Sequence, residues 1–258
     1  MADNPRWQEL LDKAVNEPGT IHKAYSQFWE YSAGNQMLAY AQCLGRHITP
    51  GPISTYPGWI AKGRHVKRGE KAITLCMPVT FKAQGKDAEG DAEEKVVTGF
   101  VYRPHWFVLA QTDGDAYTPP PPPEWDKGRA LAALDIAEVE FASTDGNCQG
   151  YAREGTVAVS PLAFNAYKTL IHECAHVLMH QGDHQDGTQT PRDLKEVEAE
   201  CVALLVSEAL DLGNQAECRG YIQHWMRQGG KDAIPEKSAQ RIFANADKIL
   251  KAGRQVRQ

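Results

Sequence analysis

Five consecutive prolines, residues 119–123, constrain the fold of this 258-residue chain more than any other feature. Because proline fixes its φ angle and has no backbone N–H, the run cannot join a helix or a central strand. It favours an extended polyproline segment that rises roughly 3 Å per residue. We therefore predict that residues 115–125 are a linker between two domains, which cover residues 1–114 and 126–258.

The hydrophobic pattern differs on the two sides of this predicted linker. On the N-terminal side, apolar residues at helical spacing precede segments rich in β-branched and aromatic residues, at 71–81 and 95–110. On the C-terminal side, three short strand-like segments precede four expected helices, near 161–181, 191–212, 215–228 and 235–252. The predicted fold class is α+β, with an N-terminal α+β module and a C-terminal helical domain that carries a small β-sheet.

Composition narrows the class of protein. Nothing approaches 18 consecutive apolar residues, so no membrane span is predicted. The N-terminus lacks the basic-then-apolar layout of a secretion signal. The six cysteines include no CxxC pair, as in proteins of a reducing compartment. We expect a cytoplasmic protein.

The sequence HECAH, residues 172–176, lies inside an apolar run that reads as a helix. His172 and His176 are four positions apart, so on a helix they share a face and can bind one zinc ion. Glu173, one step round the helix, is placed to take a proton from a water molecule on the metal. The alternative is a pair of helix histidines with structural hydrogen bonds, but unpaired imidazoles are costly in a buried helix. We predict a metal site with Glu173 as the catalytic base.

A third ligand is expected from the next predicted helix. Glu196 and Glu200 lie four residues apart on it. We assign Glu196 as the ligand of a His₂Glu site and Glu200 as the acceptor of a hydrogen bond from a ligand histidine. Glu198 points about 200° away from Glu196 on an ideal helix and is the first substitute if the helix is rotated. His184 and Asp186 in the preceding loop stay open as ligands, and so does a solvated acidic helix start without metal.

Such a site is typical of a zinc metallopeptidase that uses a glutamate as its third ligand. The ligand types favour Zn²⁺, with Mn²⁺ as the alternative ion. The metal would activate water and polarise a carbonyl, and Glu173 would pass the proton to the leaving nitrogen.

A basic block stands out within a chain of net charge -5. Residues 44–82 contain seven lysines and arginines but one acidic residue. Within this block the sequence YPGWIAKGRHVKRGEK mixes aromatic and basic residues, the combination that binds a single strand of nucleic acid by stacking and by phosphate contacts. The alternative is a core tryptophan beside a solvated basic turn. The predicted nucleic-acid-binding residues are Trp59, Lys62, Arg64, Lys67, Arg68 and Lys71.

Five segments in a specific order carry a resemblance to a known family. They are YSAGNQMLAYAQ (31–42), GWIAKGRHVKRGEKAITLCMP (58–78), FVYRPHWFVLAQTDG (100–114), KTLIHECAHVLMH (168–180) and KEVEAECVALLV (195–206). With these segments the chain resembles the ArdC family of antirestriction proteins, which bacterial plasmids and phages carry. The last two segments also resemble the wider group of ImmA/IrrE-like zincins.

The resemblance implies an N-terminal domain that binds single-stranded DNA and a C-terminal metallopeptidase-like domain. It also implies a bacterial protein encoded on a mobile element, which shields incoming DNA from the restriction enzymes of the recipient. The expected partners are single-stranded DNA and a protein substrate, either a restriction enzyme or a regulator. Three functions stay open: a peptidase targeted by DNA binding, a DNA-coating protein with a structural metal site, and a regulatory peptidase that cleaves a repressor.

Overall fold

The computed structural model describes residues 6–86, 92–143, 145–181, 190–213, 215–228 and 234–254. They divide into two compact units. Unit 1 is Leu38–Pro119, and unit 2 combines the residues up to Met37 with those from Pro120 onward. The helices before Met37 therefore pack with the C-terminal part of the chain, whereas the sequence pattern placed them in the N-terminal domain.

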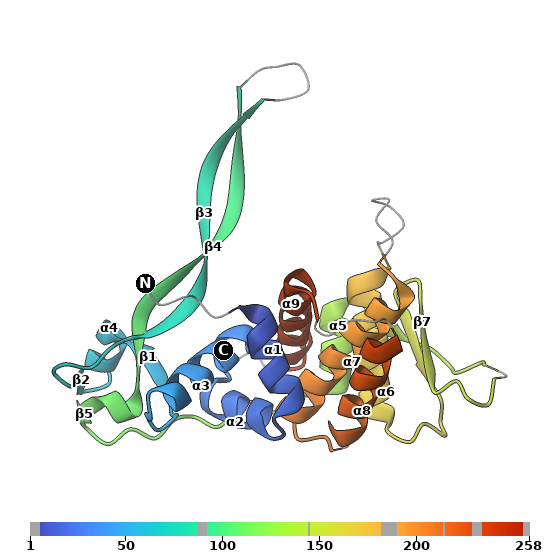
Figure 1. The fold of residues 1–258 in the computed structure, drawn as a ribbon, viewed down its shortest axis with the longest axis horizontal. Helices are drawn as coiled ribbons and strands as arrows, with labels where there is room; N and C mark the ends of the chain where they lie inside the picture. Colours follow the sequence, from blue (N-terminus) through green and yellow to red (C-terminus); the bar gives the residue numbers. More distant parts are fainter. Residues whose placement is uncertain are drawn as a thin grey trace. The chain divides into compact units, whose positions relative to one another are not determined.

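Unit 1 is built on a three-stranded antiparallel sheet with the strand order β1-β4-β3. The strands β3 and β4 form a long two-stranded ribbon that pairs from Ile73↔Trp106 to Lys86↔Ala92, with one shift of register between Ile73 and Thr74 (Figure 1). A second, two-stranded sheet joins β2 to β5. The elements are β1 (Ile53–Thr55), α4 (Tyr56–Ile60), β2 (Arg64–Val66), β3 (Ile73–Lys86), β4 (Ala92–Val108), a 3-10 turn (Leu109–Gln111) and β5 (Thr112–Gly114). These agree with the two strand-rich segments predicted around residue 90.

Unit 2 is mainly helical and has a small sheet with the strand order β6-β8-β7. Its elements are α1 (Trp7–Asn16), α2 (Thr20–Phe28), α5 (Lys127–Leu134), β6 (Ala137–Glu138), β7 (Gly150–Arg153), β8 (Thr156–Val159), α6 (Ala166–His180), α7 (Arg192–Ala209), α8 (Gln215–Gln228) and α9 (Glu236–Ala252). Helix α3 (Ala33–Gly45) spans the division between the two units. Two details differ from the sequence pattern, because α5 was not predicted and residues 139–143 form no strand.

Helix α7 is the centre of unit 2. All of its residues from Val197 to Ala209 are buried, and it packs against α2, α6, α8 and α9. A helix that is buried all round has neighbours on every side. The carboxylates that α7 carries are therefore held by the core of the unit rather than by a surface loop.

A buried ion pair fixes the N-terminal helices within unit 2. The Glu208 carboxylate on α7 accepts hydrogen bonds from the Ile21 backbone N–H, at 3.1 Å, and from the Arg219 guanidinium. Arg219 also donates to the Val15 carbonyl oxygen at 2.6 Å. Because the partners lie far apart in sequence, no local pattern indicated that residues 6–37 belong to this unit.

The end of the proline run also belongs to unit 2. The Trp29 indole N–H donates to the Pro120 carbonyl oxygen at 3.4 Å, and the Trp125 indole N–H donates to the Ile249 carbonyl oxygen at 3.1 Å. The chain from Pro120 onward is therefore tied to unit 2 by hydrogen bonds at Pro120 and Trp125. Among the residues described, no helix is both long and apolar enough to cross a membrane.

Candidate metal centre and nucleic-acid interface

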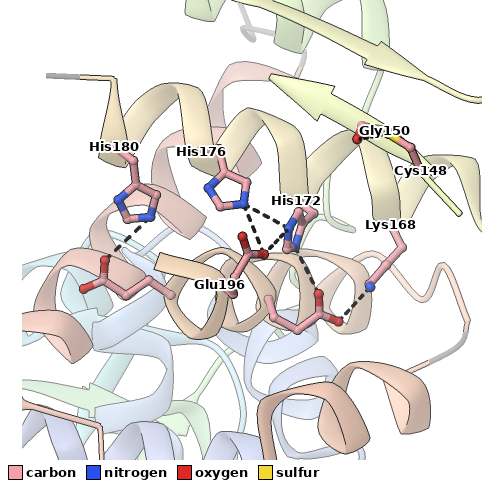
Figure 2. A network of polar contacts seen from close by, with 9 residues as sticks. Cys148, Gly150, Lys168, His172, His176, His180 and Glu196 are labelled. Carbon is pink, nitrogen blue, oxygen red and sulfur yellow. Dashed lines mark hydrogen bonds and ion pairs between the residues drawn. The ribbon is translucent and has the colours of Figure 1, made fainter. Parts of the chain in front are cut away.

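The sequence HECAH lies on α6, as the apolar pattern predicts. The Asn165 side chain caps the helix by accepting a hydrogen bond from the Lys168 backbone N–H at 2.9 Å. One helical turn separates His172 from His176, and their Nε2 atoms face each other at 3.0 Å. Figure 2 shows both rings on the same side of α6, turned toward the neighbouring helix α7.

Helix α7 brings two glutamates to these histidines. The Glu196 Oε2 atom lies 3.4 Å from Nε2 of His172 and 3.6 Å from Nε2 of His176 (Figure 2). The ligand-type atoms of these three residues all lie within 4.8 Å of one another. Glu200, one turn further along α7, approaches the other nitrogen of His172, with its Oε2 atom 3.0 Å from Nδ1.

The other ligands that the sequence left open lie elsewhere. The carboxylate of Glu198 is completely buried and is 3.7 Å from Nε2 of His180 and 3.7 Å from Nη1 of Arg241. It therefore contacts the next turn of α6 and helix α9 instead of the His172–His176 pair. His184 and Asp186 are outside the described residues.

Glu173 lies beside the histidine pair and is largely buried. Burial raises the pKa of its carboxyl group, while the neighbouring imidazoles of His172 and His176 oppose that rise. The backbone of β7 passes so close that a Cβ atom on Gly150 would be 3.0 Å from the Glu173 Oε1 atom. Only glycine leaves room for this carboxylate at residue 150.

The carboxylates of the cluster favour the protonated form of His172. Burial lowers the pKa of His172, but hydrogen bonds to Glu196 and Glu200 outweigh that effect and raise the pKa to about 9. Burial likewise raises the pKa of Glu196, yet its hydrogen bonds to His172 and His176 bring it well below the ordinary value. A positive charge between these carboxylates is thus favourable.

The cluster opens into a cleft of about 1480 Å³ between α6, α7, α8 and β7. Phe164 and Tyr221 line it and remain 72% and 54% exposed, so two large apolar surfaces face the space beside the cluster. Cavities of this size accommodate drug-sized molecules or a segment of polypeptide.

Sequence reasoning missed two residues that contact the cluster. The Lys168 Nζ atom is 2.8 Å from Oε1 of Glu200. The Cys218 thiol on α8 also interacts with Glu200, and burial raises the pKa of this thiol to about 12. A signal for Lys168 was present, because it is a lysine one turn before His172 in an otherwise apolar run.

The basic block contradicts the prediction for Trp59. Its side chain is completely buried, and its indole N–H donates to the Phe107 carbonyl oxygen at 2.7 Å. A ring enclosed in this way cannot stack on nucleotide bases. The prediction that Trp59 contacts nucleic acid is wrong, and the alternative of a core tryptophan describes it.

Two of the predicted basic residues hold the fold of unit 1 together. Arg64 donates to Oγ1 of Thr112 at 2.8 Å, to the Thr112 carbonyl oxygen at 3.0 Å and to the Gly114 carbonyl oxygen at 3.2 Å. These bonds join β2 to β5. Lys67 donates to the Ala110 carbonyl oxygen at 3.0 Å and also faces Asp113. The Arg64 guanidinium and the Lys67 ammonium are therefore both already bonded within unit 1.

The other three predicted basic residues are on the surface. Lys62, Arg68 and Lys71 are exposed. The Lys62 ammonium lies 5.7 Å from the centre of the Trp59 ring and 5.8 Å from that of Tyr117. Lys62 also donates long hydrogen bonds to the Gly58 carbonyl oxygen, at 3.3 Å, and to Oγ of Ser54, at 3.4 Å. Because all three side chains are exposed, they can reach phosphate groups without disturbing the core.

Comparison with known families matches the N-terminal part of the chain. Residues 3–103 match the family described as the N-terminal domain of anti-restriction factor ArdC. Among curated proteins no significant match was found.

Comparison with solved structures extends the likeness to nearly the whole chain. The metal-free crystal structure of the antirestriction ArdC protein from the R388 plasmid has a TM-score of 0.53 at 19% identity, covering 96% of this chain and 94% of that one. The Mn(II)-bound structure of the same plasmid protein has a TM-score of 0.52 at 17% identity, covering 97% and 99%. At these identities the likeness establishes a shared fold.

Proposed function

We propose that the chain is an antirestriction protein of the ArdC family. The match of residues 3–103 to the N-terminal domain of ArdC and the fold shared with the R388 protein support this proposal. In this proposal unit 1 binds single-stranded DNA and unit 2 is a metallopeptidase. Together they protect incoming plasmid or phage DNA from restriction in the bacterial cytoplasm. The observation that carries the proposal is the convergence of His172, His176 and Glu196 at an open cleft.

The donor set fits a divalent cation. In a tetrahedral zinc site with bonds near 2.1 Å, neighbouring ligand atoms are about 3.4 Å apart. The three separations here are 3.0, 3.4 and 3.6 Å. Two imidazoles and a carboxylate favour Zn²⁺, and Mn²⁺ is the alternative because the similar R388 protein has a Mn(II)-bound structure. Glu200 would orient His172 from the opposite side of the ring.

The position of Glu173 supports a peptidase rather than a purely structural metal site. When bound, the cation would lower the pKa of a water molecule and polarise a substrate carbonyl. Glu173 would accept a proton and return it to the leaving nitrogen, and its raised pKa suits both roles. Structural zinc sites are closed by four protein ligands, whereas the described residues of this cluster offer three and face a cleft.

Single-strand binding by unit 1 is supported by the exposed cations within the family-matched region. Lys62, Arg68 and Lys71 are on the surface of that region. The stacking contribution would come from an exposed ring such as Tyr56, which is 52% exposed.

Glu173→Gln separates a peptidase from a DNA-coating protein. The variant keeps the three ligands, so it should bind metal like the wild type and lose hydrolysis by a factor of about 10² or more. Protection of plasmid DNA from a restriction enzyme is then compared between the two proteins. Lost protection with intact metal and DNA binding supports the peptidase, and full protection contradicts the role of proteolysis and favours coating.

A further inference from the structure

Lys168 is a cation that the proposed chemistry does not use. It lies on α6 one turn before His172, and its side chain is 17% exposed. Its Nζ atom is 2.8 Å from Oε1 of Glu200, whose side chain is 3% exposed. Figure 2 shows Lys168 on the same helix as His172, and both members of the ion pair line the cleft.

Helix α8 encloses this ion pair. The Lys168 ammonium lies 5.0 Å from the centre of the Tyr221 ring, at a distance typical of a cation–π contact. The Cys218 thiol, on the same helix, also interacts with Glu200. The ion pair of Lys168 and Glu200 lies among α6, α7 and α8. Removing two charged groups from water costs free energy, which favours a specific role for the pair.

Glu200 uses its two oxygens for different partners. Its Oε1 atom faces the Lys168 ammonium at 2.8 Å, and its Oε2 atom is 3.0 Å from Nδ1 of His172. A carboxylate with one partner can turn about its terminal torsion, which is broad and roughly two-fold. With a partner on each oxygen, that rotation is blocked.

We propose that Lys168 is a positioning residue of the metal centre: it holds one oxygen of Glu200 so that the other stays on Nδ1 of His172. Nε2 of His172 then faces Nε2 of His176 and the Glu196 carboxylate. The inference rests on the metal site proposed above, and Lys168 acts only through Glu200. The hydrogen bond that the second imidazole nitrogen makes decides which nitrogen can bind a metal.

Two effects of Lys168 on metal binding have opposite signs. As a cation near a site for another cation, it weakens binding by direct repulsion, so its removal alone would strengthen binding. As the residue that positions Glu200, it strengthens binding, so its removal would weaken it. The sign of the change therefore distinguishes a positioning residue from a bystander charge.

The test measures Zn²⁺ and Mn²⁺ affinities of the full-length chain by competition with a chelator. For Lys168→Met we expect a dissociation constant about 10–100-fold higher, the range for lost partners of ligand histidines. Lys168→Arg should recover most of the affinity, and Lys237→Met, at an exposed lysine on α9, is the matched control. Unchanged or tighter binding by Lys168→Met would overturn the proposal.

A double-mutant cycle tests the route through Glu200. In a Glu200→Gln background, Lys168→Met should cause little further loss, because the oxygen that the ammonium holds is already uncharged. Additive losses would contradict the proposal. If Lys168→Met does not fold, Lys168→Gln replaces it in both measurements and is expected to weaken binding in the same direction.

A measurement without metal keeps this inference separate from the proposed function. In metal-free wild type, NMR should detect a protected Nδ1–H proton of His172, hydrogen-bonded to Glu200. In Lys168→Met the same proton should exchange faster with water. Faster exchange in a protein that binds no metal would support the positioning and reject the metal site, whereas unchanged exchange would reject the positioning itself.

Discussion

The histidine–glutamate cluster of unit 2 and the basic block of unit 1 were both predicted from residue types at short spacings. The structure agrees with the first prediction more closely than with the second. On α6 and α7, the ligand atoms of the three side chains that their spacing predicted to bind metal lie within 4.8 Å of one another. In the basic block, Trp59 is buried, and Arg64 and Lys67 bond to backbone carbonyls. Residue types at short spacings thus identified side chains that lie together in the cluster. In the basic block they did not distinguish surface residues from residues that stabilise the fold.

The difference has a geometric cause. On a helix a spacing of four fixes the direction of both side chains, so His172 and His176 must share a face. The basic block runs through a five-residue helix, a three-residue strand and turns, where spacing says little about direction. There, long basic side chains satisfy the carbonyl oxygens that short elements leave unpaired.

The largest expected effect is on the stability of unit 1. Trp59→Ala should lower the free energy of unfolding by about 3–5 kcal/mol, because it removes a fully buried ring and a hydrogen bond. Chemical denaturation measures this, with Tyr56→Ala, at a half-exposed ring, as the control that should unfold like the wild type. A Trp59→Ala protein of unchanged stability that no longer bound single strands would restore the stacking role and remove the contrast between the two regions.

A smaller effect concerns the pH dependence of metal binding in unit 2. Since the pKa of His172 is about 9 without metal, its imidazole is protonated at pH 7 and a cation must displace that proton. The apparent affinity should therefore rise by up to about tenfold per pH unit from pH 7 to about pH 9, and then level off. The Glu196 carboxylate, with its lowered pKa, is already ionised over this range.

Calorimetry in buffers of different ionisation enthalpy counts the displaced protons. We expect about one proton released per metal ion near pH 7 and only about 0.1 near pH 10, one unit above the pKa of His172. Equal proton release at both pH values would contradict the hydrogen-bonded arrangement of His172 with Glu196 and Glu200.

The smallest effects belong to the exposed cations of unit 1. If Lys62, Arg68 and Lys71 each contact a phosphate, replacing one by alanine should reduce the salt slope of single-strand affinity by about 0.7. Arg64→Ala should leave that slope unchanged and lower stability instead, because its guanidinium bonds to backbone oxygens. Binding titrations at several salt concentrations measure the slope for each variant. A slope that falls only for Arg64→Ala would contradict our assignment of Lys62, Arg68 and Lys71 to phosphate contacts and of Arg64 to the stability of the fold.

Periodicity and spacing predicted much of the fold, and contacts between distant parts of the chain account for most of what they missed. The helical runs and the two long strands were readable because each is a local pattern. The attachment of residues 6–37 to unit 2 was not, since it depends on Glu208 and Arg219, which lie far along the chain. Lys168 was overlooked for a similar reason, because its partner Glu200 is on another helix.

The central claim is that one divalent cation binds between α6 and α7. Anomalous scattering from crystals of protein loaded with Zn²⁺ or Mn²⁺ tests it most directly. We expect a single strong peak per chain, within bonding distance of Nε2 of His172, Nε2 of His176 and a Glu196 carboxylate oxygen. A loaded protein with no peak there, or with its metal at other residues, would contradict the account.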